Sequence, residues 1–162
     1  MAADLVIRDA TASDVAFIAD ANAAMALETE HKTLDPATLA RGVAAVFEQP
    51  ARGFYLIAEQ GGRAVGCLMI TREWSDWRDG DWWWLQSVYV VPTARRGGVF
   101  RALHAAVEQR AAAERDVIGL RLYVERNNAR AQATYASIGL NETDYRLYER
   151  EDASRVRRRG AP

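Results

Sequence analysis

The chain has 162 residues, 49% of them hydrophobic and 27% charged, with a net charge of −1 and a pI near 6.1. This balance is typical of one globular domain and excludes a disordered chain, and the near-neutral charge argues against nucleic acid as the main partner. The single cysteine, Cys67, excludes an internal disulfide and fits a reducing compartment.

The first ten residues, MAADLVIRDA, carry acids where a signal peptide needs bases, and they contain no apolar core. No run in the sequence approaches the roughly 18 apolar residues of a membrane span. We therefore expect a cytoplasmic protein that does not act at a membrane.

The first half of the chain predicts strands where apolar residues alternate and helices where they recur every three to four residues. Thr11 is a good N-cap for the first helix, and Asp35 followed by Pro36 is typical of the start of a second. The expected elements are a strand at 5–8, a helix from about 12 to Leu27, a polar stretch at 28–32, a helix from Pro36 to 48, and strands at 54–59 and 64–72 joined by a hairpin turn at 60–63.

The second half begins with a polar segment at 74–80, which we expect to be a loop. The later elements are a strand at 85–91 ended by Pro92, a turn at 93–98, a helix to about Arg115, a strand at 119–125, a helix at 128–138 and a last strand at 145–148. In the long helix the apolar stripe leaves His104 on the polar face, where we expect it to be solvated.

This order, hairpins first and then a β-α-β unit, predicts a mixed sheet in an α/β (α+β) layered domain. We expect a single domain over 1–150, followed by a basic, frayed tail at 151–162.

A Gly-rich basic turn joins the fourth predicted strand to the long helix and reads Arg95-Arg96-Gly97-Gly98-Val99-Phe100. The first N–H groups of a helix lack internal partners, and a turn without Cβ atoms lets an anion approach them, so this arrangement binds phosphate. The sequence contains neither a Walker loop nor a Gly-x-Gly-x-x-Gly fingerprint. The alternative is a plain strand–turn–helix connection.

A second pattern combines Asn128, Ala131, Tyr135 and Gly139 with a large apolar residue, Leu140. The two patterns, in this order and with a strand between them, resemble the signatures of the GNAT N-acetyltransferase superfamily over most of the chain. Only Phe100 departs from the first signature, which usually has a small residue at that position. The resemblance implies a mixed, mainly antiparallel central sheet of six to seven strands flanked by about four helices.

The resemblance also implies acetyl-CoA as cosubstrate, no metal, and transfer of acetyl to a primary amine by direct attack in a ternary complex. Tyr135 would donate a proton to the departing thiolate, which a phenol with a pKa of about 10 is able to do. Strand N–H groups near Val88 and Val90 would polarise the thioester oxygen. The residues expected to bind the cofactor are Val88, Val90, Arg95, Arg96, Gly97, Gly98, Val99, Phe100, Arg101, Asn128 and Ala131.

The acceptor is expected to be a small-molecule amine, contacted by Glu28, Trp84 and Gln86. Many relatives place a carboxylate on the fourth strand about where Trp84 stands. Deprotonation through water, an amine that arrives neutral, or a base at Glu28 or Glu30 therefore all remain open. Glu28 also fits a solvated loop. The five tryptophans fit either a core with a homodimer or edge contact, or an aromatic wall for the acceptor.

Two other functions remain open from the sequence. One is a non-catalytic module that binds or senses acyl-CoA. The other is a nucleic-acid binder, for which the basic charge is small. Cys67 is expected to be a packed side chain, and no His/Cys/Asp cluster has metal-ligand spacing.

Overall fold

The computed structural model describes residues 4–152. The chain divides into two compact units, one that ends at Leu122 and one that begins at Tyr123. Most of the expected tail at 151–162 lies outside the described residues.

The first unit contains a five-stranded sheet whose strand order equals the chain order. Neighbouring strands pair antiparallel from β1 to β4, and β5 pairs parallel with β4. This confirms the mixed, mainly antiparallel sheet. The strands are β1 (Leu5–Asp9), β2 (Phe54–Gln60), β3 (Arg63–Ser75), β4 (Gly80–Val90) and β5 (Val117–Arg121).

Three helices belong to the first unit and one to the second. They are α1 (Val15–Glu30), α2 (Pro36–Glu48), α3 (Val99–Ala113) and α4 (Ala129–Ser137), with short 3₁₀ turns at Ala12–Asp14, Pro50–Arg52 and Pro92–Ala94. None of the helices described here is long and apolar enough to cross a membrane.

The expected count of six to seven strands is wrong, because the described residues form five. Residues 145–148 make no strand. Tyr145 and Tyr148 keep 80% and 88% of their surface exposed, so the segment lacks the apolar burial that stabilises a strand. The loop expected at 74–80 is also shorter, since β3 and β4 continue into it and leave only the turn at 76–79.

Several strands and helices begin or end at the residues that local sequence signals predict. Gly61 and Gly62 have φ of 59° and 74°, as the two central residues of a tight hairpin turn require. The Asp35 carboxylate accepts a hydrogen bond from the Thr38 N–H at 2.7 Å and caps α2. Gly139 follows α4 with a φ of 88°, which supports its expected place at the end of that helix.

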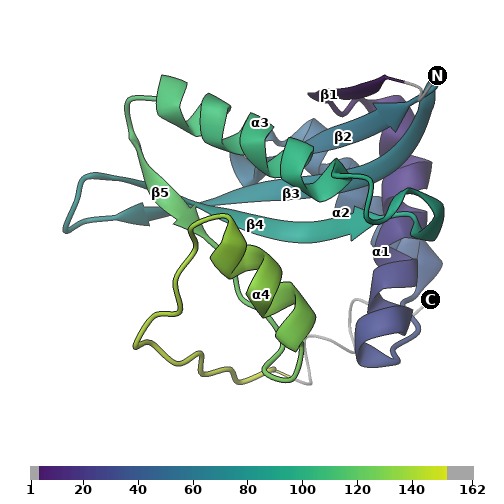
Figure 1. Cartoon of the computed structure of the whole chain (residues 1–162). Helices are drawn as coiled ribbons and strands as arrows, with labels where there is room; N and C mark the ends of the chain where they lie inside the picture. Colours follow the sequence, from purple (N-terminus) through teal and green to yellow (C-terminus); the bar gives the residue numbers. More distant parts are fainter. Residues whose placement is uncertain (1–3, 153–162) are drawn as a thin grey trace. The chain divides into compact units, whose positions relative to one another are not determined.

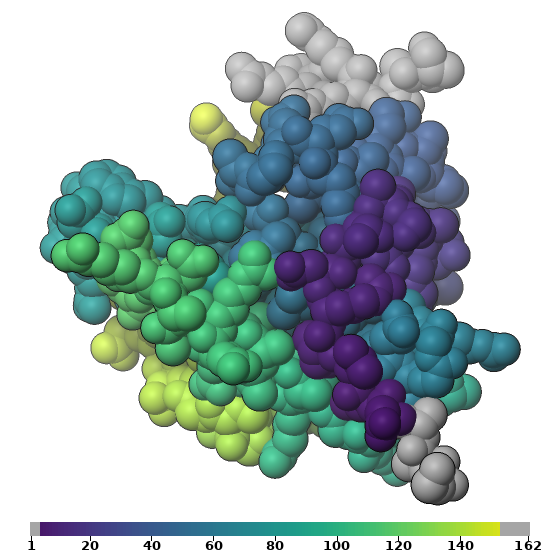
Figure 2. Space-filling view, turned by 90° about the horizontal axis from the view of Figure 1, so that it is seen from above, coloured from purple at the N-terminus to yellow at the C-terminus, as the bar shows by residue number. Residues whose placement is uncertain are grey.

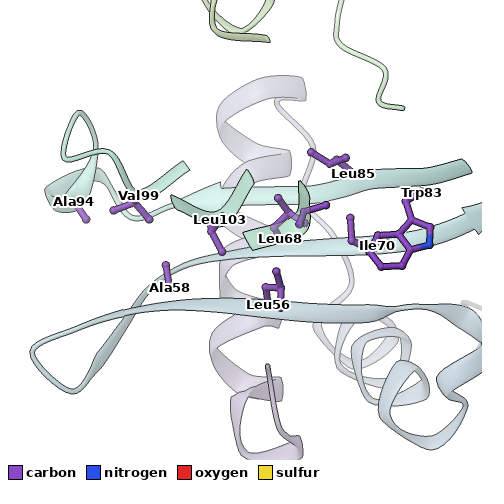
Figure 3. Close-up of a cluster of buried hydrophobic side chains, with 10 residues drawn as sticks. Leu56, Ala58, Leu68, Ile70, Trp83, Leu85, Ala94, Val99 and Leu103 are labelled. Carbon is purple, nitrogen blue, oxygen red and sulfur yellow. The ribbon is translucent and has the colours of Figure 1, made fainter. Parts of the chain in front are cut away.

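One core lies between the sheet and α3, which runs along one face of the sheet (Figure 1). Figure 3 shows side chains of this core. Trp83 from β4 is 2% exposed and meets Phe54 edge to face, with ring centroids 5.3 Å apart. Seen from above, α3 lies beside β1 (Figure 2). The core residues are Leu56, Ala58, Leu68, Ile70, Trp83, Leu85, Ala94, Val99, Leu103 and Val107.

A second core lies on the opposite face, beneath α1 and α2. Its sheet residues include Tyr55, Ile57, Cys67 and Tyr89. Because both faces of β2 and β3 are covered, these strands are apolar on both sides rather than alternating.

The expectation that His104 is solvated is wrong. It is 2% exposed, and its Nδ1 lies 3.4 Å from the Glu108 carboxylate. The buried face of α3 is centred on Leu103 and Val107, and this stripe is wide enough to include the residue next to Leu103.

The core around Trp83 makes a quantitative prediction. Trp83→Ala should lower the free energy of unfolding by about 3–5 kcal/mol, because it removes a fully buried ring and leaves a cavity. The matched control is Trp77→Ala, at a side chain that is 88% exposed, where the change should stay within about 0.5 kcal/mol. Urea unfolding of both variants measures the difference, and equal losses would contradict the assignment of Trp83 to the core.

Candidate functional site at the edge of strand β4

A β-bulge at Ser87 interrupts β4. The pairing with β3 changes register between Cys67 and Met69, and Ser87 has a φ of 50°. A bulge inserts one extra residue, so the side-chain alternation shifts by one position beyond it. Before the bulge, Leu85 packs in the core beneath α3, and after it Tyr89 packs in the core beneath α1 and α2.

The bulge also decides where the backbone N–H groups of β4 point. The Val91 N–H donates to the Val65 oxygen of β3 at 2.9 Å. Because N–H directions alternate along a strand, those of Val90 and Val88 point to the opposite edge. The pairing of β4 with β5 ends at Trp84, and no other described strand pairs with that edge. Two N–H groups therefore face an open edge.

The turn between β4 and α3 begins beside this edge. Arg96 and Gly98 adopt left-handed conformations, with φ of 65° and 78°, and Gly98 is the N-cap of α3. Among the described residues, nothing lies within 4 Å of a Cβ built on Gly98. The first-turn N–H groups of α3 have no acceptors within the helix. Gly98 thus leaves open space in front of donors and the positive end of a helix dipole.

The ring of Phe100, the residue that departs from the signature, lies beside the ring of His104 on α3. Its centroid is 6.1 Å from that of His104, one helical turn later. The side chain is half-buried.

Arg95 makes three contacts where the turn before α3 meets the end of α1. Its Nε donates to the Val90 oxygen at 2.9 Å, and its Nη2 lies 2.7 Å from the Glu28 carboxylate. Its guanidinium also lies over the Tyr89 ring, 5.4 Å from the centroid. Arg95 therefore joins the turn before α3 to the end of α1.

Glu28 has a second partner besides Arg95. The Tyr89 hydroxyl donates to the other Glu28 oxygen at 3.1 Å. Burial and this hydrogen bond raise the pKa of Tyr89. Glu28 is thus held by two defined contacts, and the expectation that it belongs to a merely solvated loop is wrong.

The other two residues expected to contact the amine substrate lie on one side of β4. Trp84 and Gln86 point away from the core beneath α3 and are half-buried. The Gln86 amide donates to the Thr71 hydroxyl at 2.7 Å, and the Trp84 indole N–H donates to the Glu73 carboxylate. Glu73 comes from β3, so a carboxylate lies beside Trp84 although β4 itself carries none from Trp82 onward.

Glu73 and its partner Arg121 on β5 are not among the site residues expected from the sequence. Arg121 pairs with Glu73 at 3.1 Å and lies over the Trp82 ring, 4.0 Å from the centroid. Trp82 in turn covers Gly119, where an added Cβ would lie 2.5 Å from the ring. Arg72-Glu73-Trp74 does not alternate between polar and apolar residues, so the sequence carries no signal that β3 continues through Glu73.

The tryptophans therefore divide into three groups. Trp83 is core, Trp82 and Trp84 lie half-buried on the opposite face, and Trp74 and Trp77 are 62% and 88% exposed. Trp82 and Trp84 share a face because side chains alternate along β4 before the bulge.

The second unit contains the other signature. The Asn128 side chain accepts from the Ala131 N–H at 3.1 Å, which confirms that Asn128 caps α4. Tyr135 lies in the middle of α4, and burial raises the pKa of its phenol. A phenol with a raised pKa keeps its proton at neutral pH and is able to donate it.

Side chains beneath the bulge are fixed by burial. Burial raises the pKa of the Tyr55 hydroxyl, and the neighbouring side chains of Asn22 and Ser87 partly offset this rise. Cys67 is fully buried, and burial raises the pKa of its thiol to about 12. This agrees with a packed rather than a nucleophilic cysteine.

Cys67 should therefore resist alkylation in the native protein. A rise in pKa from 9.0 to about 12 lowers the thiolate fraction at pH 8 by about a thousandfold. Iodoacetamide followed by mass spectrometry should show labelling only after denaturation. Rapid labelling of protein with native circular dichroism would contradict the buried position.

Comparisons with known proteins agree on one family. A family model described as Acetyltransferase (GNAT) family matches residues 18–140. A solved structure of a possible acetyltransferase from Clostridium difficile 630 is 40% identical, covers 91% of this chain and 97% of that chain, and superposes with a TM-score of 0.86. None of the curated proteins compared with the chain matches it.

Two further solved structures share the fold at lower identity. A predicted acetyltransferase with acetyl-CoA from Clostridium acetobutylicum is 16% identical over 91% of this chain and 96% of that chain, with a TM-score of 0.73. A ribosomal-protein-alanine N-acetyltransferase from Brucella melitensis biovar Abortus 2308 is 17% identical over 93% and 100%, with a TM-score of 0.74. At these identities the likeness concerns the fold alone.

Proposed function

Because this chain belongs to the GNAT family of acetyltransferases, we propose that it moves an acetyl group from acetyl-CoA to a primary amine of a small molecule by direct attack in a ternary complex. The observation that carries the proposal is the open edge of β4 beside the Gly98 entrance to α3. An edge with free N–H groups suits an extended amide-bearing arm, and a helix N-terminus suits phosphates.

The proposed cofactor site places the phosphates at the turn. The backbone around Gly97 and Gly98 would donate to the pyrophosphate, joined by N–H groups of Val99, Phe100 and Arg101 in the first turn of α3. The space in front of Gly98 supports this fit. Arg95 and Arg96 are exposed and add positive charge. Asn128 and Ala131, at the start of α4, are also proposed to contact the cofactor, as the family signature implies.

The chemistry follows from the donors at the open edge. The amine nitrogen attacks the thioester carbon, and the carbonyl electrons move to an oxygen that the Val88 and Val90 N–H groups stabilise. When the carbonyl re-forms, the C–S bond breaks and the thiolate takes a proton from Tyr135. The nitrogen loses its extra proton to water, or the amine binds in its neutral form.

The acceptor would bind on the side of β4 that carries Trp84 and Gln86. Glu28 lies on α1, and its partner Tyr89 is on this same side of the sheet beyond the bulge. Aromatic rings and a carboxylate together favour an acceptor with an apolar body and a cationic group.

Coenzyme A should raise the melting temperature of the wild type, because a ligand that binds only the native state stabilises it. Gly98→Glu should abolish this shift, since its carboxylate would lie where phosphates bind. The matched control is Gly62→Glu, which adds the same charge at another glycine with a positive φ and open surroundings. Thermal shift measures both, and an unchanged CoA response in Gly98→Glu would show that the phosphates bind elsewhere.

Tyr135→Phe removes one hydroxyl and keeps the ring. It should lower kcat by roughly ten- to several-hundred-fold, the usual scale for lost acid–base catalysis, with little change in CoA affinity. Tyr145→Phe, at an 80% exposed tyrosine of the same unit, is the control and should behave as wild type.

The measurement for Tyr135 is the pre-steady-state rate of acetyl transfer, because product release is able to hide a chemical defect in kcat. An unchanged transfer rate would mean that the thiolate leaves without a proton from Tyr135.

A further inference from the structure

Arg95 lies where the Glu28 carboxylate and a bound phosphate would compete for its guanidinium. It belongs to the turn proposed to bind phosphates, yet its Nη2 lies 2.7 Å from the Glu28 carboxylate. Its Nε is bonded to the Val90 oxygen, which anchors the guanidinium at the edge of β4. A guanidinium has donors in a fixed plane, so turning them toward a phosphate changes the contact with Glu28.

The contact between Glu28 and Arg95 is accessible and easily exchanged. The two side chains keep 41% and 37% of their surface exposed. Exposed ion pairs of this kind contribute little, because water screens them. A pyrophosphate carries more negative charge than one carboxylate, so it attracts the same guanidinium more strongly.

Glu28 keeps a partner when Arg95 turns away. The Tyr89 hydroxyl donates to the Glu28 oxygen that Arg95 does not contact, at 3.1 Å. Tyr89 is buried and fixed in the core beneath α1 and α2. The carboxylate therefore stays in position but loses its countercharge.

We propose that Arg95 exchanges Glu28 for a phosphate of coenzyme A, and that the released Glu28 carboxylate then binds a cationic group of the acceptor. This inference rests on the proposed function. Before the cofactor binds, Arg95 masks the carboxylate, and afterwards the carboxylate is available. The arrangement makes binding ordered, with cofactor before acceptor, and selects acceptors that carry an ammonium group in addition to the reacting amine.

The exchange predicts that one substitution at the site strengthens the binding of coenzyme A instead of weakening it. Glu28→Gln removes the competitor for Arg95, so coenzyme A should bind more tightly than to wild type, by roughly two- to fivefold, as expected for loss of an exposed pair. The control is Glu30→Gln, which removes the same charge two residues later, where the carboxylate pairs with Lys32. Isothermal titration with coenzyme A measures all three proteins, and Glu30→Gln should show no such gain.

Two further binding experiments identify the groups that take part in the exchange. In the Arg95→Gln background, Glu28→Gln should have no effect on coenzyme A affinity, because the shared partner is gone. Pantetheine lacks the phosphates, so its affinity should not respond to Glu28→Gln. The same gain with pantetheine, or in the Arg95→Gln background, would overturn the exchange.

The acceptor half is tested with saturating coenzyme A present. Wild type should bind 1,5-diaminopentane more tightly than pentylamine, and Glu28→Gln should bind the two alike. Equal binding by the wild type would overturn the role of Glu28 in recognition.

The outcomes separate this inference from the proposed function. Wild type that binds no coenzyme A would overturn both. Wild type that binds coenzyme A, with Glu28→Gln binding it equally or more weakly, would overturn only the exchange. Circular dichroism of each variant confirms that a loss of binding is not a loss of fold.

Discussion

The β-bulge at Ser87 is the constraint on which the proposed site depends. With regular alternation, Tyr89 would continue the row of Trp83 and Leu85 beneath α3. The extra residue turns Tyr89 to the other face, where it reaches Glu28, and turns the Val88 and Val90 N–H groups toward the open edge. One positive φ in β4 thus supplies both the donors for a thioester and the contact with α1.

The charged groups around Arg95 do not form a buried ion pair. Glu28 and Arg95 are partly exposed, and the more buried partner, Tyr89, is neutral. Burying a charged pair costs desolvation that the attraction rarely exceeds. Keeping the charges at the surface leaves Arg95 free to change partner, while the neutral Tyr89 keeps the geometry.

Local features were predictable from the sequence, and features that join distant segments were not. The glycines of the β2–β3 turn, the Asp35 and Asn128 caps and the turn before α3 each depend on a few adjacent residues. Nothing in Gln86-Ser87-Val88 indicates a bulge, because serine rarely adopts a positive φ. Glu28 and Arg95 are far apart in the chain, so their contact appears only once α1 packs on β4. The buried position of His104 depends on how wide a stripe of α3 the sheet covers.

The strand order has a consequence for how the molecule folds. Strands β2, β3 and β4 follow one another through short turns, so their pairing closes small loops, whereas β1 pairs across two intervening helices and β5 across α3. Short loops cost less chain entropy, so the three-stranded meander is expected to form early. The bulge lies within this meander, and Glu28 reaches it only when α1 docks. The edge that would hold the cofactor is therefore built first, and the carboxylate that would select the acceptor arrives later in folding.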